Sequence, residues 1–253
     1  MTDEINIKKY GENGILEQND LIIKEHRSNL YVNGEFYISL MCLPQHLDVL
    51  AVGFLYSEGV ISSYADVVKI DLTCIDDILI TVRNVPNDAN PGKRAIVSGF
   101  ARGSVNLPFL DKNLPMMNSL LKISPDEIIK MAAFFNKQSD LFQETGAVHS
   151  CSMNLPDGVN LFYEDIGRHN AADKIIGRAL IDGLCAANGI FLTSGRISSE
   201  ILIKVASLGV PILLSTSAPT NMAVEIARKL NMTLIGFARD DRFNIYSGDC
   251  RIA

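Results

Sequence analysis

Residues 190–237 read IFLTSGRISSEILIKVASLGVPILLSTSAPTNMAVEIARKLNMTLIGF, and this stretch decides the fold. Three short apolar runs in it alternate with two amphipathic stretches that begin near Ser198 and Pro219. Because strands joined by helical crossovers run parallel, the pattern predicts a mainly parallel sheet covered by helices. The predicted strands span residues 190–193, 210–215 and 233–237.

The same alternation of predicted strands and helices extends upstream to Ser124. Two β-rich runs, residues 147–153 and 159–163, flank Pro156-Asp157-Gly158 and predict an antiparallel hairpin. A helix is expected from about Arg168. The capping box Ser124-Pro125-Asp126-Glu127 predicts another helix that runs to about Phe142. Residues 124–253 are therefore expected to form a three-layer α/β domain.

Residues 1–123 look like a smaller β-rich region with one helix, so the chain is α+β as a whole. Asn33-Gly34 lies between two β-rich runs and favours a two-residue hairpin turn. Apolar residues recur at helical spacing from Pro44 to Ser57. Two β-rich runs follow, and the Pro- and Gly-containing stretch from Pro86 to Gly92 predicts a loop.

Composition limits the class of protein. Of the 253 residues, 47% are hydrophobic and 21% charged, which is typical of a soluble globular chain. The net charge of −6 disfavours a general nucleic-acid binder, and no segment is expected to span a membrane. The N-terminus is acidic where a secretory signal would be basic, so a cytoplasmic location is expected.

Five scattered cysteines include no C-x-x-C pair. Neither a disulfide framework nor a zinc or other structural metal site is predicted.

Two of the predicted strand-to-helix junctions repeat one arrangement of small polar residues. The first contains Ser194, Gly195 and Arg196, and the second contains Ser217 and Thr220. Helix N-termini at the carboxyl ends of parallel strands present free N–H groups that suit phosphate. The alternative is that Ser198, Ser217 and Thr220 only cap their helices.

A third candidate lies just past the last predicted strand, in the segment Phe237-Ala238-Arg239-Asp240-Asp241-Arg242. Two arginines three residues apart can hold a pyrophosphate, and the aspartates can accept hydrogen bonds from ribose hydroxyls or a guanine edge. A solvated turn of mutually neutralising charges is the alternative.

The segment from Glu164 to Lys174 predicts a helix with Asp165 as its N-cap, followed by Arg168. His169 and Asp173, four residues apart, would share a face, so the carboxylate could orient the imidazole. This pairing would support a nucleoside hydrolase, or it would be structural. His149 and Cys151 would point to the same side of a strand, where an imidazolium would favour a reactive thiolate. An inert, buried Cys151 is the alternative.

Taken together, these motifs closely resemble the formate dehydrogenase accessory sulfurtransferase family, FdhD/NarQ. The resemblance is carried by residues 164–174, 193–196, 217–220 and 236–244, and also by 53–59 and 145–150. It implies a cytidine-deaminase-like α/β domain, a smaller N-terminal domain and a homodimer. The reaction of zinc deaminases is not expected, because their H-x-E and P-C-x-x-C ligands are missing.

The resemblance also implies a function. A member of this family carries sulfur from a cysteine desulfurase to the molybdenum bis-guanine-dinucleotide cofactor before the cofactor enters formate dehydrogenase. The family's cofactor-binding stretch corresponds to residues 237–242, and we expect Ser194, Gly195, Arg196, Ser217, Thr220, Asp165, Arg168 and His169 to bind or border the same cofactor.

One position departs from the family pattern. The persulfide-forming cysteine of the family lies in the loop that corresponds to Val97 to Gly103, where this chain has Phe100. Either another thiol carries the sulfur, with Cys151 beside His149 as the candidate, or the protein is a cofactor-binding chaperone without sulfur transfer.

Overall fold

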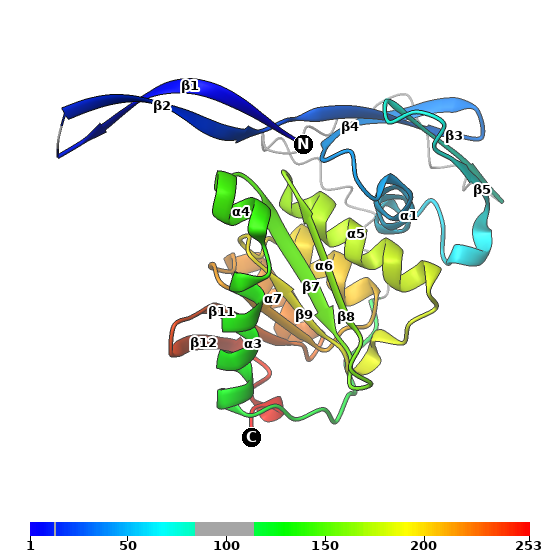
Figure 1. Cartoon of the computed structure of the whole chain (residues 1–253). Helices are drawn as coiled ribbons and strands as arrows, with labels where there is room; N and C mark the ends of the chain where they lie inside the picture. The colour runs from blue at the N-terminus through cyan, green and yellow to red at the C-terminus, as the bar shows by residue number, and fades with distance from the viewer. Residues whose placement is uncertain (13, 84–113) are drawn as a thin grey trace.

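The computed structural model describes residues 1–12, 14–83 and 114–253. The predicted Pro86 to Gly92 loop, and the Val97 to Gly103 segment with Phe100, lie outside these residues. The described chain forms three sheets: a two-stranded arm, a four-stranded sheet and a six-stranded sheet (Figure 1).

The six-stranded sheet has the order β12-β11-β10-β9-β7-β8. Its middle follows the prediction, because β9, β10 and β11 run parallel. The hairpins β7–β8 and β11–β12 are antiparallel, and so is the contact of β7 with β9, which makes the sheet mixed rather than mainly parallel. Its strands are β7 (His149–Asn154), β8 (Asn160–Asp165), β9 (Ile190–Thr193), β10 (Ile212–Ser215), β11 (Thr233–Arg239) and β12 (Arg242–Ser247).

Helices cover both faces of this sheet (Figure 1). Successive side chains of a strand point to opposite faces, so in β9 Leu192 packs into the core beneath α3, while Phe191 packs into the other core, with residues of α5, α6 and α7. The helices are α3 (Pro125–Lys137), α4 (Asp140–Thr145), α5 (Arg168–Ile181), α6 (Ser199–Ser207) and α7 (Asn221–Lys229), with single 3-10 turns η3 (Ala186–Asn188) and η4 (Asp249–Arg251).

The four-stranded sheet has the order β4-β3-β6-β5 and packs against one helix, α1. Asn33 and Gly34 form the predicted turn, both with positive φ (52° and 85°). The helix begins at Leu47, later than the predicted Pro44, and ends before Gly59, whose φ of 75° suits a C-cap. The elements are β3 (His26–Val32), β4 (Glu35–Cys42), α1 (Leu47–Glu58), η1 (Tyr64–Asp66), β5 (Val67–Asp71) and β6 (Asp77–Val82).

Helix α1 crosses α5 at a contact between two glycines. A Cβ on Gly53 would lie 1.8 Å from the carbonyl oxygen of Asp173, and a Cβ on Gly177 would lie 1.9 Å from that of Val49. Only glycine lets the two backbones approach this closely. The crossing joins the N-terminal sheet to the α/β body, with α5 lying between them (Figure 1).

Buried charges stabilise the same junction. Asp165 and Lys174 are almost completely buried and form an ion pair of 2.7 Å. The Asp165 carboxylate also accepts hydrogen bonds from the N–H groups of Leu43 and Gly167 and from the Asn170 amide. This corrects two expectations about Asp165. It caps no helix, since Gly167 is the N-cap of α5, and it is sealed in the interior, where it cannot contact a cofactor.

Residues 114–123, expected in the N-terminal region, pack on the α/β body. Met117 belongs to the core beside α5 to α7 and its N–H donates to the Leu230 carbonyl. Arg251, 2% exposed, donates to the carbonyls of Met117, Ser119 and Asn231.

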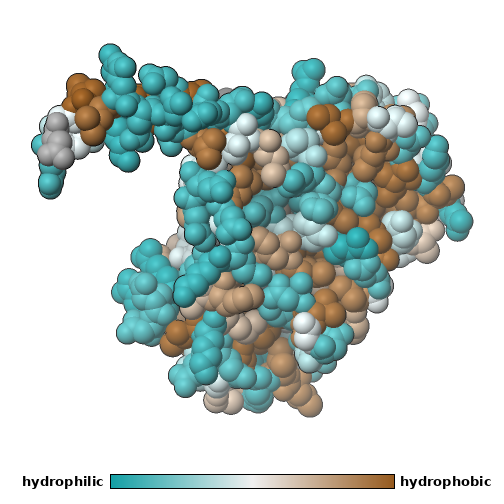
Figure 2. All heavy atoms as spheres, viewed as in Figure 1, coloured by the Kyte–Doolittle hydropathy of each residue, from teal (hydrophilic) through white to brown (hydrophobic). Residues whose placement is uncertain are grey.

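The strands β1 (Thr2–Gly11) and β2 (Gly14–Ile23) form the arm, which is not among the predicted elements. They pair along their whole length, from Thr2 opposite Ile23 to Gly11 opposite Gly14. Figure 1 shows the arm extending away from the rest of the chain, and Figure 2 shows apolar residues on its surface. Among the described residues no helix is long and apolar enough to cross a lipid bilayer.

Candidate functional site

The candidate site lies where β9 and β10 end and β7 begins. Two capped helices start there as predicted: the Ser198 hydroxyl accepts the N–H of Ile201, and the Thr220 hydroxyl accepts that of Ala223. The two junction loops are joined, because the Ile197 N–H donates to the Ala218 carbonyl and the Thr220 N–H to the Ile197 carbonyl. The helix-capping interpretation therefore holds for Ser198 and Thr220, and both junctions lie at one sheet edge.

Ser194 connects the first junction to β7. Its hydroxyl accepts the N–H of Ser150 at 3.0 Å and lies 3.2 Å from Nδ1 of His149. Gly195 leaves room for a side chain from α5, since a Cβ there would come within 3.0 and 3.1 Å of two carbons of Arg168. The glycine thus lets the arginine lie directly against the strand end.

Several basic side chains gather around this point. Burial, together with Arg196, lowers the pKa of Arg168, and burial together with Arg168 lowers that of His149. Burial also holds the pKa of His169 well below 6.5, with further contributions from Lys204, Arg168 and His149. Its Nε2 lies 3.4 Å from the carboxylate of Glu200. We call His149, Arg168, His169 and Arg196 the basic cluster.

The basic cluster is suited to an anionic ligand. Nε of Arg168 is buried and has no hydrogen-bond partner among the described residues, so one strong donor is left for a ligand. The two histidines are neutral, so the positive charge comes from Arg168 and Arg196, and a bound anion would offset the mutual repulsion of these two guanidinium groups.

The segment 237–242 lies two strands away, at the end of β11. Phe237 has a φ of 54°, an uncommon conformation for a bulky residue, and its N–H donates to the carbonyl of Ser217. Arg239 lies over the Phe237 ring at 5.9 Å and pairs with Arg242 across the β11–β12 turn. Arg239, Asp240, Asp241 and Arg242 are exposed, whereas Ala238 is buried.

Two expectations about reactive residues are wrong. Cys151 is completely buried and burial raises its thiol pKa to about 12, so it is not a thiolate at neutral pH. The neighbouring His149, with its lowered pKa, does not supply an imidazolium. Asp173 does not orient His169: it is buried, and it binds Lys204 at 2.6 Å and the Ser57 hydroxyl at 2.7 Å.

Sequence reasoning missed Glu200 and Lys204, the partners of His169 and Asp173. Both lie on one helix, α6, at positions that look like ordinary surface charges, and only the contact of α6 with α5 reveals them. Of the five cysteines, Cys42 and Cys151 are buried, while Cys74, Cys185 and Cys250 are exposed. Among the described residues no group of three His, Cys, Asp or Glu side chains is placed to hold a metal ion.

The fold and the site define a three-layer α/β protein with a cation-lined sheet edge and an appended small sheet domain. The chain belongs to the FdhD/NarQ family, whose model matches residues 23–253.

Relatives resemble the chain along nearly its whole length. It is 38% identical over 252 residues to a protein of Listeria innocua named sulfur carrier protein FdhD, with 97% of each chain covered. It is 34% identical to the protein of the same name from Bacillus subtilis, covering 96% of this chain and 95% of the relative. A crystal structure of a candidate formate dehydrogenase accessory protein from Desulfotalea psychrophila has the same fold, with a TM-score of 0.82 at 23% identity over 100% of this chain and 99% of that one.

Proposed function

We propose that this protein is a sulfur carrier required for formate dehydrogenase activity. It takes sulfur from a cysteine desulfurase and transfers it to the molybdenum bis-guanine-dinucleotide cofactor before the cofactor is inserted, and it does so in the cytoplasm as a homodimer. The observation that carries the proposal is the near full-length similarity to proteins named sulfur carrier protein FdhD.

The geometry of the sheet edge supports the cofactor part of the proposal. Neighbouring strands lie about 4.8 Å apart, so the ends of β11 and β9 are separated by roughly 10 Å. A dinucleotide is long enough to extend from Arg239 and Arg242 to the basic cluster. The cluster would hold phosphate groups, with Arg168 Nε as one donor, and the exposed aspartates 240 and 241 would accept from the ribose or guanine.

Sulfur transfer needs an accessible thiolate. The thiolate attacks the outer sulfur of the desulfurase persulfide, an S–S bond forms on the carrier as the donor S–S bond breaks, and the donor cysteine leaves as a thiolate. Cys74, Cys185 and Cys250 are the exposed thiols among the described residues. We propose one of these as the carrier in place of Cys151.

Intact-protein mass spectrometry after incubation with a cysteine desulfurase and cysteine tests the transfer. A persulfide adds about 32 Da. We expect the adduct on the wild type and on Cys151→Ala, and we expect its loss in the variant with Cys74, Cys185 and Cys250 all changed to alanine. An adduct that disappears in Cys151→Ala alone would contradict the assignment to an exposed thiol.

The alternative is a cofactor-binding chaperone without sulfur transfer, which the burial of Cys151 and the presence of Phe100 favour. In that case the wild type acquires no adduct.

Calorimetry with GDP measures nucleotide binding, and it does so whether or not the protein transfers sulfur. Arg168→Ala, and Arg239→Ala with Arg242→Ala, should each weaken binding about tenfold or more, because a hydrogen bond to a charged group contributes about 1.5–3 kcal/mol. Arg27→Ala, an exposed arginine of the N-terminal sheet, is the matched control. Unchanged affinity in all variants would contradict the placement of the cofactor.

A further inference from the structure

His169 is the member of the basic cluster whose charge can change. Its side chain is 22% exposed, and its Nε2 lies 3.4 Å from the carboxylate of Glu200, in the first turn of α6. At this distance a protonated imidazole would form an ion pair with the carboxylate. The geometry of an ion pair is therefore present, although the imidazole of the free protein is neutral.

The groups that decide this balance lie on three elements. Burial is the strongest influence against a charged imidazole. The side chains that add to it are Lys204 of α6, Arg168 of α5 and His149 of β7. Lys204 is itself paired with the Asp173 carboxylate at 2.6 Å. Glu200 faces His169 from the other sign, so a further negative charge near Arg168 would act in the same direction as Glu200.

The other histidine of the cluster is less suited to taking up a proton. Nδ1 of His149 lies 3.2 Å from the Ser194 hydroxyl, which already accepts the N–H of Ser150 at 3.0 Å. The hydroxyl hydrogen can therefore point at Nδ1, which accepts it. A proton on Nδ1 would displace that hydrogen bond, whereas a proton on His169 strengthens the contact with Glu200.

An anion bound to Arg168 would supply the further negative charge. Nε of Arg168 is buried and has no hydrogen-bond partner among the described residues, so it marks a place for an acceptor. The charge of Arg168 is close enough to lower the pKa of His169. A phosphate that binds this guanidinium group acts on His169 with the opposite sign, because an anion favours the charged form of an imidazole.

We propose that an anion bound at the basic cluster makes His169 take up one proton from the solvent, so that its contact with Glu200 becomes an ion pair. The inference rests on the proposed function, since the anion is the pyrophosphate of the guanine dinucleotide cofactor. It adds a regulation of that site: the cofactor binds more tightly in acid and is released more readily as the pH rises.

Diguanosine pyrophosphate, in which two guanosines are joined through their 5′-oxygens, is the probe. Both of its phosphates are diesters and do not titrate near neutral pH, whereas the terminal phosphate of GDP does. Calorimetry in buffers with different enthalpies of ionisation counts the protons taken up. For the wild type we expect about half a proton or more per dinucleotide near pH 6.5. The affinity should be about threefold or more higher at about pH 5.5 than at about pH 7.5.

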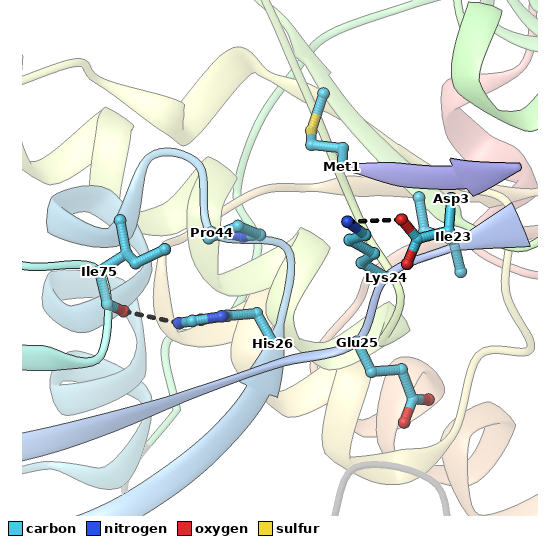
Figure 3. Close-up of a pocket in the computed structure, with 8 residues that line it drawn as sticks. All are labelled: Met1, Asp3, Ile23, Lys24, Glu25, His26, Pro44 and Ile75. Atoms are coloured by element: carbon cyan, nitrogen blue, oxygen red, sulfur yellow. Dashed lines mark hydrogen bonds and ion pairs between the residues drawn. The ribbon is translucent and has the colours of Figure 1, made fainter.

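Variants assign the proton to one residue. His169→Gln should bind the dinucleotide without proton uptake and with an affinity independent of pH, whereas His149→Gln should keep the uptake. His26→Gln is the matched control and should also keep it. Nε2 of His26 lies 3.0 Å from the Ile75 carbonyl oxygen, in a groove at the base of the arm (Figure 3). Circular dichroism shows that each variant is folded, and the wild-type pH profile needs no variant.

The possible outcomes separate the two proposals. A wild type that binds no dinucleotide at any pH would overturn both the cofactor site and the coupling. Binding without proton uptake, at an affinity independent of pH, would overturn the coupling alone. Uptake that persists in a folded His169→Gln protein would overturn the assignment to His169.

Discussion

Two histidines of the basic cluster, His149 and His169, stay neutral at a pH at which a histidine ordinarily begins to take up a proton. Burial, with help from Arg168, lowers the pKa of both below 6.5. Between the lowered pKa and 6.5, the unfolded chain binds a proton at each histidine and the folded chain does not. The two histidines therefore leave the free energy of unfolding unchanged above about pH 6.5, reduce it as the pH falls from 6.5 to their lowered pKa values, and reduce it no further below those values.

We predict that His169→Gln makes the stability less dependent on pH. The free energy of unfolding of the wild type should fall by about 1 kcal/mol per pH unit on account of His169 as the solution is acidified from about pH 6.5. Urea unfolding at a series of pH values measures this slope. His26→Gln, at the base of the arm, is the control, and equal slopes in the wild type and His169→Gln would contradict the environment assigned to His169.

At the scale of elements, the crossing of α1 and α5 depends on two glycines. We predict that Gly177→Ala destabilises the protein by about 3 kcal/mol or more, because the new Cβ would lie 1.9 Å from the Val49 carbonyl oxygen and a helix backbone must shift to make room. Thermal unfolding measures the loss. Gly11→Ala, where a Cβ meets nothing within 4 Å, should change stability by no more than about 0.5 kcal/mol. Similar midpoints for both variants would show that the crossing is not tightly packed.

Elements with local signals were predictable from the sequence. The Asn33-Gly34 turn, the Ser124 capping box and the strand over residues 190–193 are all confirmed. The predicted helix to Phe142 is wrong at its end, since α3 stops at Lys137 and Ser139 caps the separate helix α4. The arm was missed for a different reason: neither of its faces is buried within the chain, so its sequence lacks a clean alternation of apolar and polar residues.

The site was predictable only in part. The apolar run 190–193 clearly predicts a strand, and it is followed directly by Ser194, Gly195 and Arg196. Their position at the carboxyl end of the sheet follows from the topology. The contact of Arg168 with Gly195, and the burial of Asp165 and Cys151, depend on how α5 packs between two sheets. No local pattern distinguishes a buried ion pair such as Asp165–Lys174 from two surface charges.

At the scale of the whole molecule, buried polar contacts join the N-terminal sheet to the six-stranded sheet, and neither sheet can unfold alone without breaking them. The Leu43 N–H donates to Asp165 from the N-terminal part, and Ser57 of α1 donates to Asp173, while Lys174 and Lys204 neutralise the two carboxylates. Unfolding the N-terminal sheet alone would remove these donors and uncover the glycine crossing. Breaking buried charge networks of this kind costs about 3–5 kcal/mol.

We therefore predict that both parts unfold together. The chain contains no tryptophan, so a single introduced one reports on its own surroundings. Phe36→Trp in β4 and Phe134→Trp in α3 replace exposed phenylalanines, one in each part. The two fluorescence transitions in urea should share one midpoint and one slope, as a single cooperative unit requires. A Phe36→Trp transition at clearly lower urea would mean that the N-terminal sheet unfolds first, and that the interface through α1 and α5 does not couple the two parts.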